Sequence, residues 1–256
     1  MRPSRVLLAA VIGAQLLYDR VPPGRRPVAT RAIVSLLVIA SATEAVEARG
    51  AARGLSVVGG AGAVGFAAEL AGVATGRPFG HYAYSPLLGP RIRGVPLLAA
   101  AAWAMLARPA WVVAGLLVGR RPARVVVAAG ALTAWDVFLD PRMVREGYWS
   151  WPGGGRYEDV PLSNFGGWLL TSVPVFALAA VVDRADDPAR DGDGALALYV
   201  WTWVGETIAN AVIWRRPRVA AAGSLAMGAF AVPALVARRR ARAPSPSWRA
   251  CRRGQR

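Results

Sequence analysis

Apolar segments of near membrane-spanning length recur along the chain and constrain its fold more than any other feature. A helix crosses the hydrocarbon core of a bilayer with about 20 consecutive, mostly apolar residues. We therefore expect an all-α fold, a polytopic transmembrane helix bundle of seven or eight helices. The expected spans are residues 6–18, 28–48, 55–74, 95–118, 123–139, 165–182, 195–214 and 219–237.

Two places leave the number of helices open. Residues 6–18 follow Arg2 and Arg5 and could form a signal peptide, but no convincing small-residue cleavage site precedes the polar segment 19–26. We therefore expect a retained first helix. Arg108 and Pro109 interrupt the span 95–118, which is then either one kinked helix or two short helices.

The chain is strongly basic, with a net charge of +16 that comes from 31 Arg and no Lys. A basic chain can indicate nucleic-acid binding, but these Arg lie between the apolar segments and in the tail, as in polytopic membrane proteins. We expect no nucleic-acid partner and a location in the cell membrane. We also expect one transmembrane domain over residues 1–237 and an Arg-rich, disordered, cytoplasmic tail over 238–256.

Polar and aromatic residues concentrate in two loops, 75–93 and 140–164. The segment 95–139 between them decides whether the loops can meet. If it crosses the membrane out and back, both loops face the same side and can form one site; if it crosses only once, they cannot. His81 is the only His and Cys251 the only Cys, which excludes a metal site built on either residue type.

Asp136 and Asp140 lie four residues apart and share a helix face, with their Cβ atoms roughly 5–6 Å apart. In a partly dry site, two carboxylates this close cannot both ionise cheaply, so one should keep its proton. A protonated carboxylic acid can protonate a poor base such as an alkene. The alternative is structural: Asp140 caps the next turn or pairs with Arg142 or Arg145, and Asp136 bonds a neighbouring helix.

Other polar residues allow both a structural and a catalytic interpretation. Glu69 lies inside the third expected span, where an ionisable residue needs a partner or a function. Glu206 and Asn210, again four residues apart, form a polar patch in the seventh expected span. Glu158 and Asp159 follow three consecutive Gly, and we expect these two acidic residues to be solvated.

The two polar loops are also rich in Tyr and Trp. Such residues ordinarily form an aromatic belt at the membrane interface, but aromatic faces also stabilise cations. Tyr82, Tyr84 and Trp151 are our candidates for stabilising a carbocation beside a carboxylic acid, and Trp168 is a further candidate for substrate binding. Asn164 could hold a water molecule.

Three segments carry a resemblance to a known family, namely GRPFGHYAYSPLLGPRIRGVPLL, WDVFLDPRMVREGYWSW and VPLSNFGGW. They resemble the carotenoid biosynthesis family of multipass membrane proteins, which includes the carotenoid 1,2-hydratases. The resemblance covers residues 30–237 and is densest over 69–98 and 135–168. It implies addition of water across the terminal C1=C2 double bond of an acyclic carotenoid ψ-end group, which gives a tertiary alcohol.

This reaction fits the candidate residues. A general acid must protonate C2, and water must then add to the tertiary cation at C1. One member of the Asp136–Asp140 pair would be the acid and its ionised partner would orient the water, with Glu69 as a third catalytic candidate. The chemistry requires no metal and no other cofactor. The expected partners are the acyclic carotenoid within the bilayer, membrane lipids and other carotenoid-pathway enzymes.

Two alternative functions remain. A membrane prenyltransferase also has a D-x-x-x-D motif, but it needs Mg²⁺ and a second Asp-rich motif that this sequence lacks. A non-enzymatic carotenoid-binding or transport protein would use Glu69 and Asp136 as structural residues.

Overall fold

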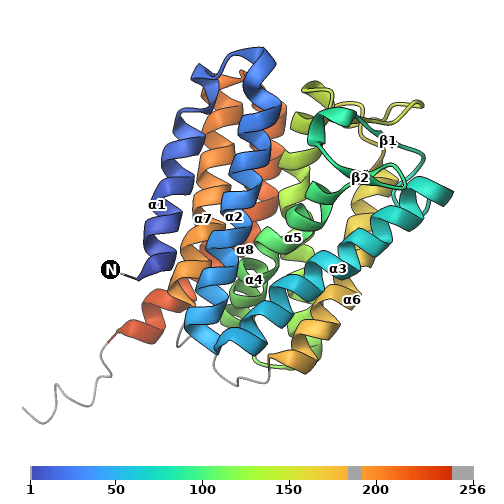
Figure 1. The fold of residues 1–256 in the computed structure, drawn as a ribbon. Coiled ribbons are helices and arrows are strands. Elements are labelled where there is room, and N and C mark those ends of the chain that lie inside the picture. Colours follow the sequence, from blue (N-terminus) through green and yellow to red (C-terminus); the bar gives the residue numbers. More distant parts are fainter. Residues whose placement is uncertain (1, 184–191, 244–256) are drawn as a thin grey trace, which may run out of the picture.

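The computed structural model describes residues 2–183 and 192–243, which form a bundle of α-helices (Figure 1). The helices are α1 (Pro3–Leu16), α2 (Arg26–Arg49), α3 (Ala51–Thr75), α4 (Leu97–Leu117), α5 (Arg121–Arg145), α6 (Leu162–Val182), α7 (Asp193–Ile208) and α8 (Pro217–Arg242). Single helical turns are η1 (Tyr18–Arg20), η2 (Pro23–Arg25), η3 (Pro86–Leu88) and the π-helical η4 (Ala209–Ile213). Short strands are β1 (Ala83–Tyr84), β2 (Arg91–Ile92), β3 (Val95–Pro96) and β4 (Trp149–Ser150). The expected all-α class is confirmed.

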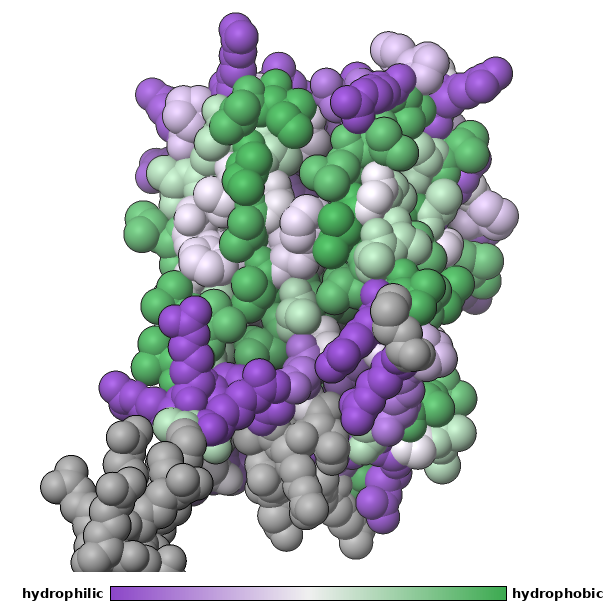
Figure 2. Space-filling model, turned by 90° about the vertical axis from the view of Figure 1, so that its left-hand side faces the viewer, coloured by the Kyte–Doolittle hydropathy of each residue, from purple (hydrophilic) through white to green (hydrophobic). Residues whose placement is uncertain are grey.

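Seven helices in the described residues are long and apolar enough to cross a membrane, if η2 is counted with α2 and η4 with α7. The eighth, α1, has 14 residues and spans only about 21 Å, less than the roughly 30 Å of a hydrocarbon core. The face shown in Figure 2 has a broad apolar belt, green and pale, between two ends rich in purple hydrophilic residues. The chain is therefore a multipass membrane protein.

The central helix α4 packs against α2, α3, α5 and α7 and runs unbroken through Arg108 and Pro109. Of the two alternatives for this span, one helix or two short helices, the structure shows one helix. Arg108 is 1% exposed, and it lies near acidic groups on two other segments. Its Nε donates to Glu44 Oε2 at 3.1 Å, and its Nη1 lies 3.5 Å from Asp183 Oδ2. These ion pairs compensate the charge that the sequence places inside the span.

The α4–α5 hairpin, joined by residues 118–120, crosses the membrane out and back. It therefore places the two polar loops at the same end of the bundle, which is the upper end in Figure 1. There β1 pairs antiparallel with β4, with Tyr84 opposite Trp149. The neighbouring strands β2 and β3 form a second small hairpin.

The N-terminal end of α1 and the C-terminal end of α8 lie at the opposite end of the bundle (Figure 1). The first residues of the expected tail are helical, because α8 continues to Arg242. Just before the last turn, Arg238 donates to Asp193 Oδ1 at 2.7 Å. The rest of the expected tail, residues 244–256, lies outside the described residues.

Candidate active site

The acidic pair lies on α5 at the end where the two loops meet. Asp136 and Asp140 are 0% and 2% exposed, one helical turn apart. Asn164, in the first turn of α6, donates its Nδ2 to Oδ2 of both carboxylates, with a distance of 2.9 Å to Asp136. Trp149 Nε1 donates to Asp140 Oδ1 at 3.1 Å. Arg142, by contrast, pairs with Glu146 and not with Asp140 among the described contacts.

A third carboxylate, Glu69 on α3, is surrounded by hydrogen-bond donors and is 5% exposed. Its Oε2 accepts hydrogen bonds from the hydroxyls of Tyr82 and of Tyr84, the latter at 2.8 Å, and its Oε1 accepts from Trp103 Nε1 at 3.0 Å. Burial raises the pKa of Tyr82 and Tyr84 well above the ordinary value, and the nearby charge of Glu69 raises it further. Both tyrosines therefore stay protonated and act as donors.

Two glycines on α3 make room for these donors on either side of Glu69. A Cβ added at Gly65 would lie 2.1 Å from Trp103 Cγ, and a Cβ at Gly72 would lie 2.8 Å from Tyr82 Oη. Both distances are far shorter than van der Waals contact. The glycines let Trp103 and Tyr82 lie directly against the helix backbone.

The carboxylates meet at a pocket with an empty volume of about 630 Å³, which we call the carboxylate pocket. Asp140 and Glu69 line it, whereas Asp136 lies behind Asp140 and is bonded to Asn164. Its polar lining comprises Glu69, Asp140, Asn164 and Thr30; its aromatic lining comprises Phe79, Tyr82, Tyr84, Trp149, Trp151 and Trp168. The remaining lining residues are aliphatic side chains, Met and Pro.

The aromatic residues of the pocket also pack on one another. Trp168 stacks on Trp103 with ring centroids 3.9 Å apart, and Tyr82 lies 5.8 Å from Trp151. Trp151 is fixed by a hydrogen bond from its Nε1 to the carbonyl oxygen of Phe79 at 3.0 Å. These contacts hold the rings in place around the carboxylates.

The eight site residues predicted from the sequence thus lie together: seven line the carboxylate pocket and Asp136 lies directly behind it. The sequence analysis did not identify Trp103 as a site residue. The available signal is its position, because Trp is expected at the ends of a membrane span and Trp103 lies inside one. The sequence analysis also did not single out Trp149 from the other Tyr and Trp residues of the two loops, although the indole N–H of Trp149 donates to Asp140.

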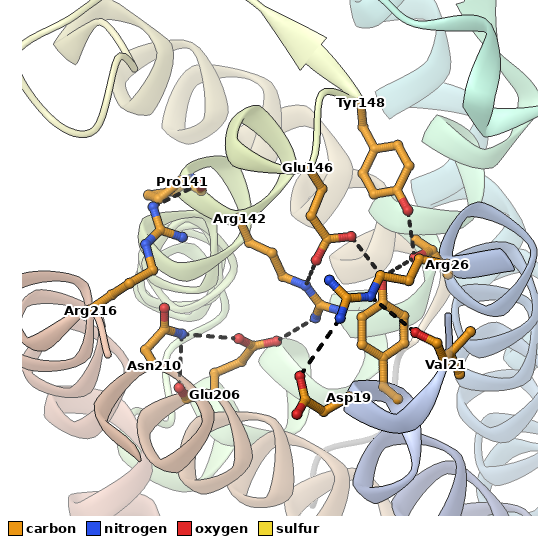
Figure 3. Close-up of polar contacts among 12 residues, drawn as sticks. Asp19, Val21, Arg26, Pro141, Arg142, Glu146, Tyr148, Glu206, Asn210 and Arg216 are labelled. Atoms are coloured by element: carbon orange, nitrogen blue, oxygen red, sulfur yellow. Dashed lines mark hydrogen bonds and ion pairs between the residues drawn. The ribbon is translucent and has the colours of Figure 1, made fainter. Parts of the chain in front are cut away.

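The other acidic candidates lie elsewhere. Glu206 is 3.5 Å from Arg142, and Asn210 bonds Glu206 within the turn where α7 becomes η4 (Figure 3). Glu158 and Asp159 are both exposed, as expected. Glu158 also forms an ion pair with Arg216 at 2.8 Å. His81 is exposed.

This arrangement defines a class: a multipass helical membrane protein with buried carboxylates at an aromatic-lined pocket. The chain belongs to the carotenoid biosynthesis protein family, whose model matches residues 29–230. It is also 35% identical over 123 residues to the bisanhydrobacterioruberin hydratase of Haloarcula japonica. That match covers 46% of this chain and 42% of the relative, so the chain aligns with less than half of the relative's length. No solved structure matches the chain.

Proposed function

We propose that this protein is a carotenoid 1,2-hydratase, which adds water across the terminal C1=C2 double bond of an acyclic carotenoid ψ-end group. The observation that carries the proposal is the placement of Asp140 and Glu69 in a pocket lined mainly by aromatic and apolar side chains. Membership of the carotenoid biosynthesis family and the partial match to a hydratase support the same reaction. The substrate is too apolar for water and reaches the pocket from the bilayer.

Asp140 is the proton donor in this proposal, because it lines the pocket while Asp136 lies behind it. The proton of Asp140 forms a bond to C2 as the C1=C2 π bond breaks, and the positive charge develops at the tertiary carbon C1. Water then adds to C1, and its surplus proton passes to the Asp136–Asp140 pair. The acid is thereby restored, and nothing is oxidised or reduced.

The remaining residues stabilise the cation and position the reactants. Glu69 provides a negative charge on the pocket wall, and its donors Tyr82, Tyr84 and Trp103 keep it in place. Tyr82 and Trp151 line the pocket, and their rings provide cation–π stabilisation in this proposal, worth about 2 kcal/mol or more when desolvated. Asn164 holds the two aspartates at a fixed separation, because one amide nitrogen bonds both.

Expression in a lycopene-accumulating bacterium tests the proposal, with Asp140→Asn as the matched control. The wild-type protein should convert lycopene to pigments that have gained one water per hydrated end, and the control at equal membrane level should not. Unchanged pigments in cells that contain the wild-type protein would overturn the proposal. Pigment that copurifies unaltered with the protein would then favour a carrier.

A further inference from the structure

Hydration consumes one water per turnover, and the described walls of the carboxylate pocket are mainly apolar or aromatic. One wall differs. Thr30 on α2 is 4% exposed and lines the pocket, and its hydroxyl bonds two other buried hydroxyls. Tyr18 Oη lies 2.9 Å from Thr30 Oγ1, and Tyr148 Oη lies 3.0 Å from it on the other side.

A second, more polar pocket lies on the far side of these hydroxyls, and we call it the vestibule. It has an empty volume of about 1050 Å³ and is found at the loop end of the bundle. Its charged and hydroxyl-bearing lining residues are Arg26, Arg142, Arg145, Glu146, Tyr148 and Arg216. Figure 3 shows Tyr148 and Glu146 projecting into the same polar cluster as Arg142 and Arg26.

Hydrogen bonds connect the vestibule to the pocket without interruption. Glu146, whose side chain is 18% exposed, accepts from the Tyr18 hydroxyl at 2.6 Å and from Arg142 Nε at 3.2 Å. Tyr18 and Tyr148 then share Thr30. Tyr148 is therefore part of the vestibule wall, and Thr30, the residue that it bonds, is part of the pocket wall.

Hydroxyl groups suit a water route because each both donates and accepts a hydrogen bond. A water molecule can take over one partner's bond as that bond opens, so no buried group is left unsatisfied. Burial raises the pKa of Tyr148, so its hydroxyl stays neutral and places no charge on the route. The aliphatic walls formed by Val34, Leu98 and Met105 provide no such partners.

We propose that the vestibule is the water entrance of the enzyme, and that Tyr18, Thr30 and Tyr148 pass water from it into the carboxylate pocket. This role rests on the proposed hydratase function. The carotenoid and the water thus arrive by separate routes, the carotenoid from the lipid and the water from the aqueous end of the bundle.

Cysteine labelling tests the route independently of catalysis. In a Cys251→Ser background, Thr30→Cys is treated with the small water-soluble reagent 2-aminoethyl methanethiosulfonate, and Ser172→Cys, buried on α6, serves as control. Thr30→Cys should react at least about tenfold faster. Adding Pro27→Trp, which puts a bulky side chain on the vestibule wall, should slow the reaction. Adding Val28→Trp should not slow the reaction, because Val28 is the next residue in the chain but is 57% exposed.

The route is refuted if Thr30→Cys reacts no faster than Ser172→Cys, or if Pro27→Trp leaves the rate at Thr30→Cys unchanged. A measurement of the hydration rate then tests whether the reaction depends on this route. Tyr148→Phe should lower the hydration rate about five- to tenfold, the scale of one hydrogen bond, with carotenoid retention unchanged. Tyr199→Phe, which removes an equally buried hydroxyl bonded to a carbonyl on α5, should leave the rate unchanged, and equal rates for both variants would contradict the role.

These two arms separate the two proposals. If Thr30→Cys is labelled fast, Pro27→Trp slows the labelling and the wild-type protein hydrates no carotenoid, the water route is supported and the proposed hydratase function is overturned. If the wild-type protein hydrates the carotenoid but its Thr30→Cys variant is not labelled, only the proposed water entrance is overturned.

Discussion

Replacing Asp140 with Asn removes the proposed proton donor while keeping the size of the side chain. The loss of a general acid typically slows a reaction roughly 10²–10⁴-fold, which is about 2.7–5.4 kcal/mol in the barrier. An alkene is a very poor base, so we expect the upper end of that range. The assay is the initial rate of hydrated pigment formed per molecule of enzyme in isolated membranes.

The structure also gives the stability cost of this change. Both oxygens of Asp140 accept hydrogen bonds, one from Trp149 and one from Asn164. An Asn at this position can accept only one of them, so its own amide must face a second donor. A buried donor without an acceptor costs about 1–3 kcal/mol. We therefore expect a lower thermal midpoint in detergent, separate from the loss of rate.

Asp136→Asn is the matched comparison. Among the described residues, Asp136 Oδ1 has no hydrogen-bond partner, so the amide nitrogen can occupy that position without facing a donor. We expect a smaller loss of stability than for Asp140→Asn, because the amide faces no opposing donor. We also expect a smaller loss of rate, which arises because the pair can no longer share a proton. If Asp140→Asn hydrates within about tenfold of the wild-type rate while Glu69→Gln is inactive, the acid is on α3 and the assignment is wrong.

Three further substitutions test the pocket. Gly72→Ala should cost about 1–3 kcal/mol of stability and displace Tyr82, whereas Gly59→Ala on the same helix, with nothing within 4 Å of the added Cβ, should have no effect in thermal melts. Glu69→Gln keeps the size of the side chain but replaces one acceptor oxygen with an amide group and removes the charge, so we expect a rate loss of roughly 10²–10³-fold and a stability cost of about 1–3 kcal/mol, with unchanged carotenoid retention; an unchanged rate would argue against its role. Glu158→Gln should change stability by no more than about 1 kcal/mol and leave the hydration rate nearly intact.

The membrane-spanning helices could be predicted because lipid imposes the same requirement on every span. The expected span 28–48 lies within α2, and 165–182 lies within α6. The candidate residues could be predicted for a related reason: an ionisable side chain such as Glu69 is costly in lipid and must point toward other polar groups. Which polar groups it meets is decided by tertiary packing.

The parts that could not be predicted depend on contacts between distant segments. Trp103 reaches Glu69 only because α3 and α4 pack at the glycines of α3. Arg108 continues its helix because Glu44 and Asp183, 64 and 75 residues away in sequence, compensate its charge. The hydroxyls of Tyr18 and Thr30 meet Tyr148 across more than 100 residues. No local pattern contains such pairings.

The source of the oxygen in the product tests the proposed hydration most directly. Cells or membranes that contain the protein and an acyclic carotenoid are incubated without dioxygen in H₂¹⁸O, and the pigments are analysed by mass spectrometry. If the protein is a hydratase, the product is a tertiary alcohol that carries ¹⁸O from water and forms without dioxygen. A product that forms only in air and takes its label from ¹⁸O₂ would contradict hydration and indicate a hydroxylase.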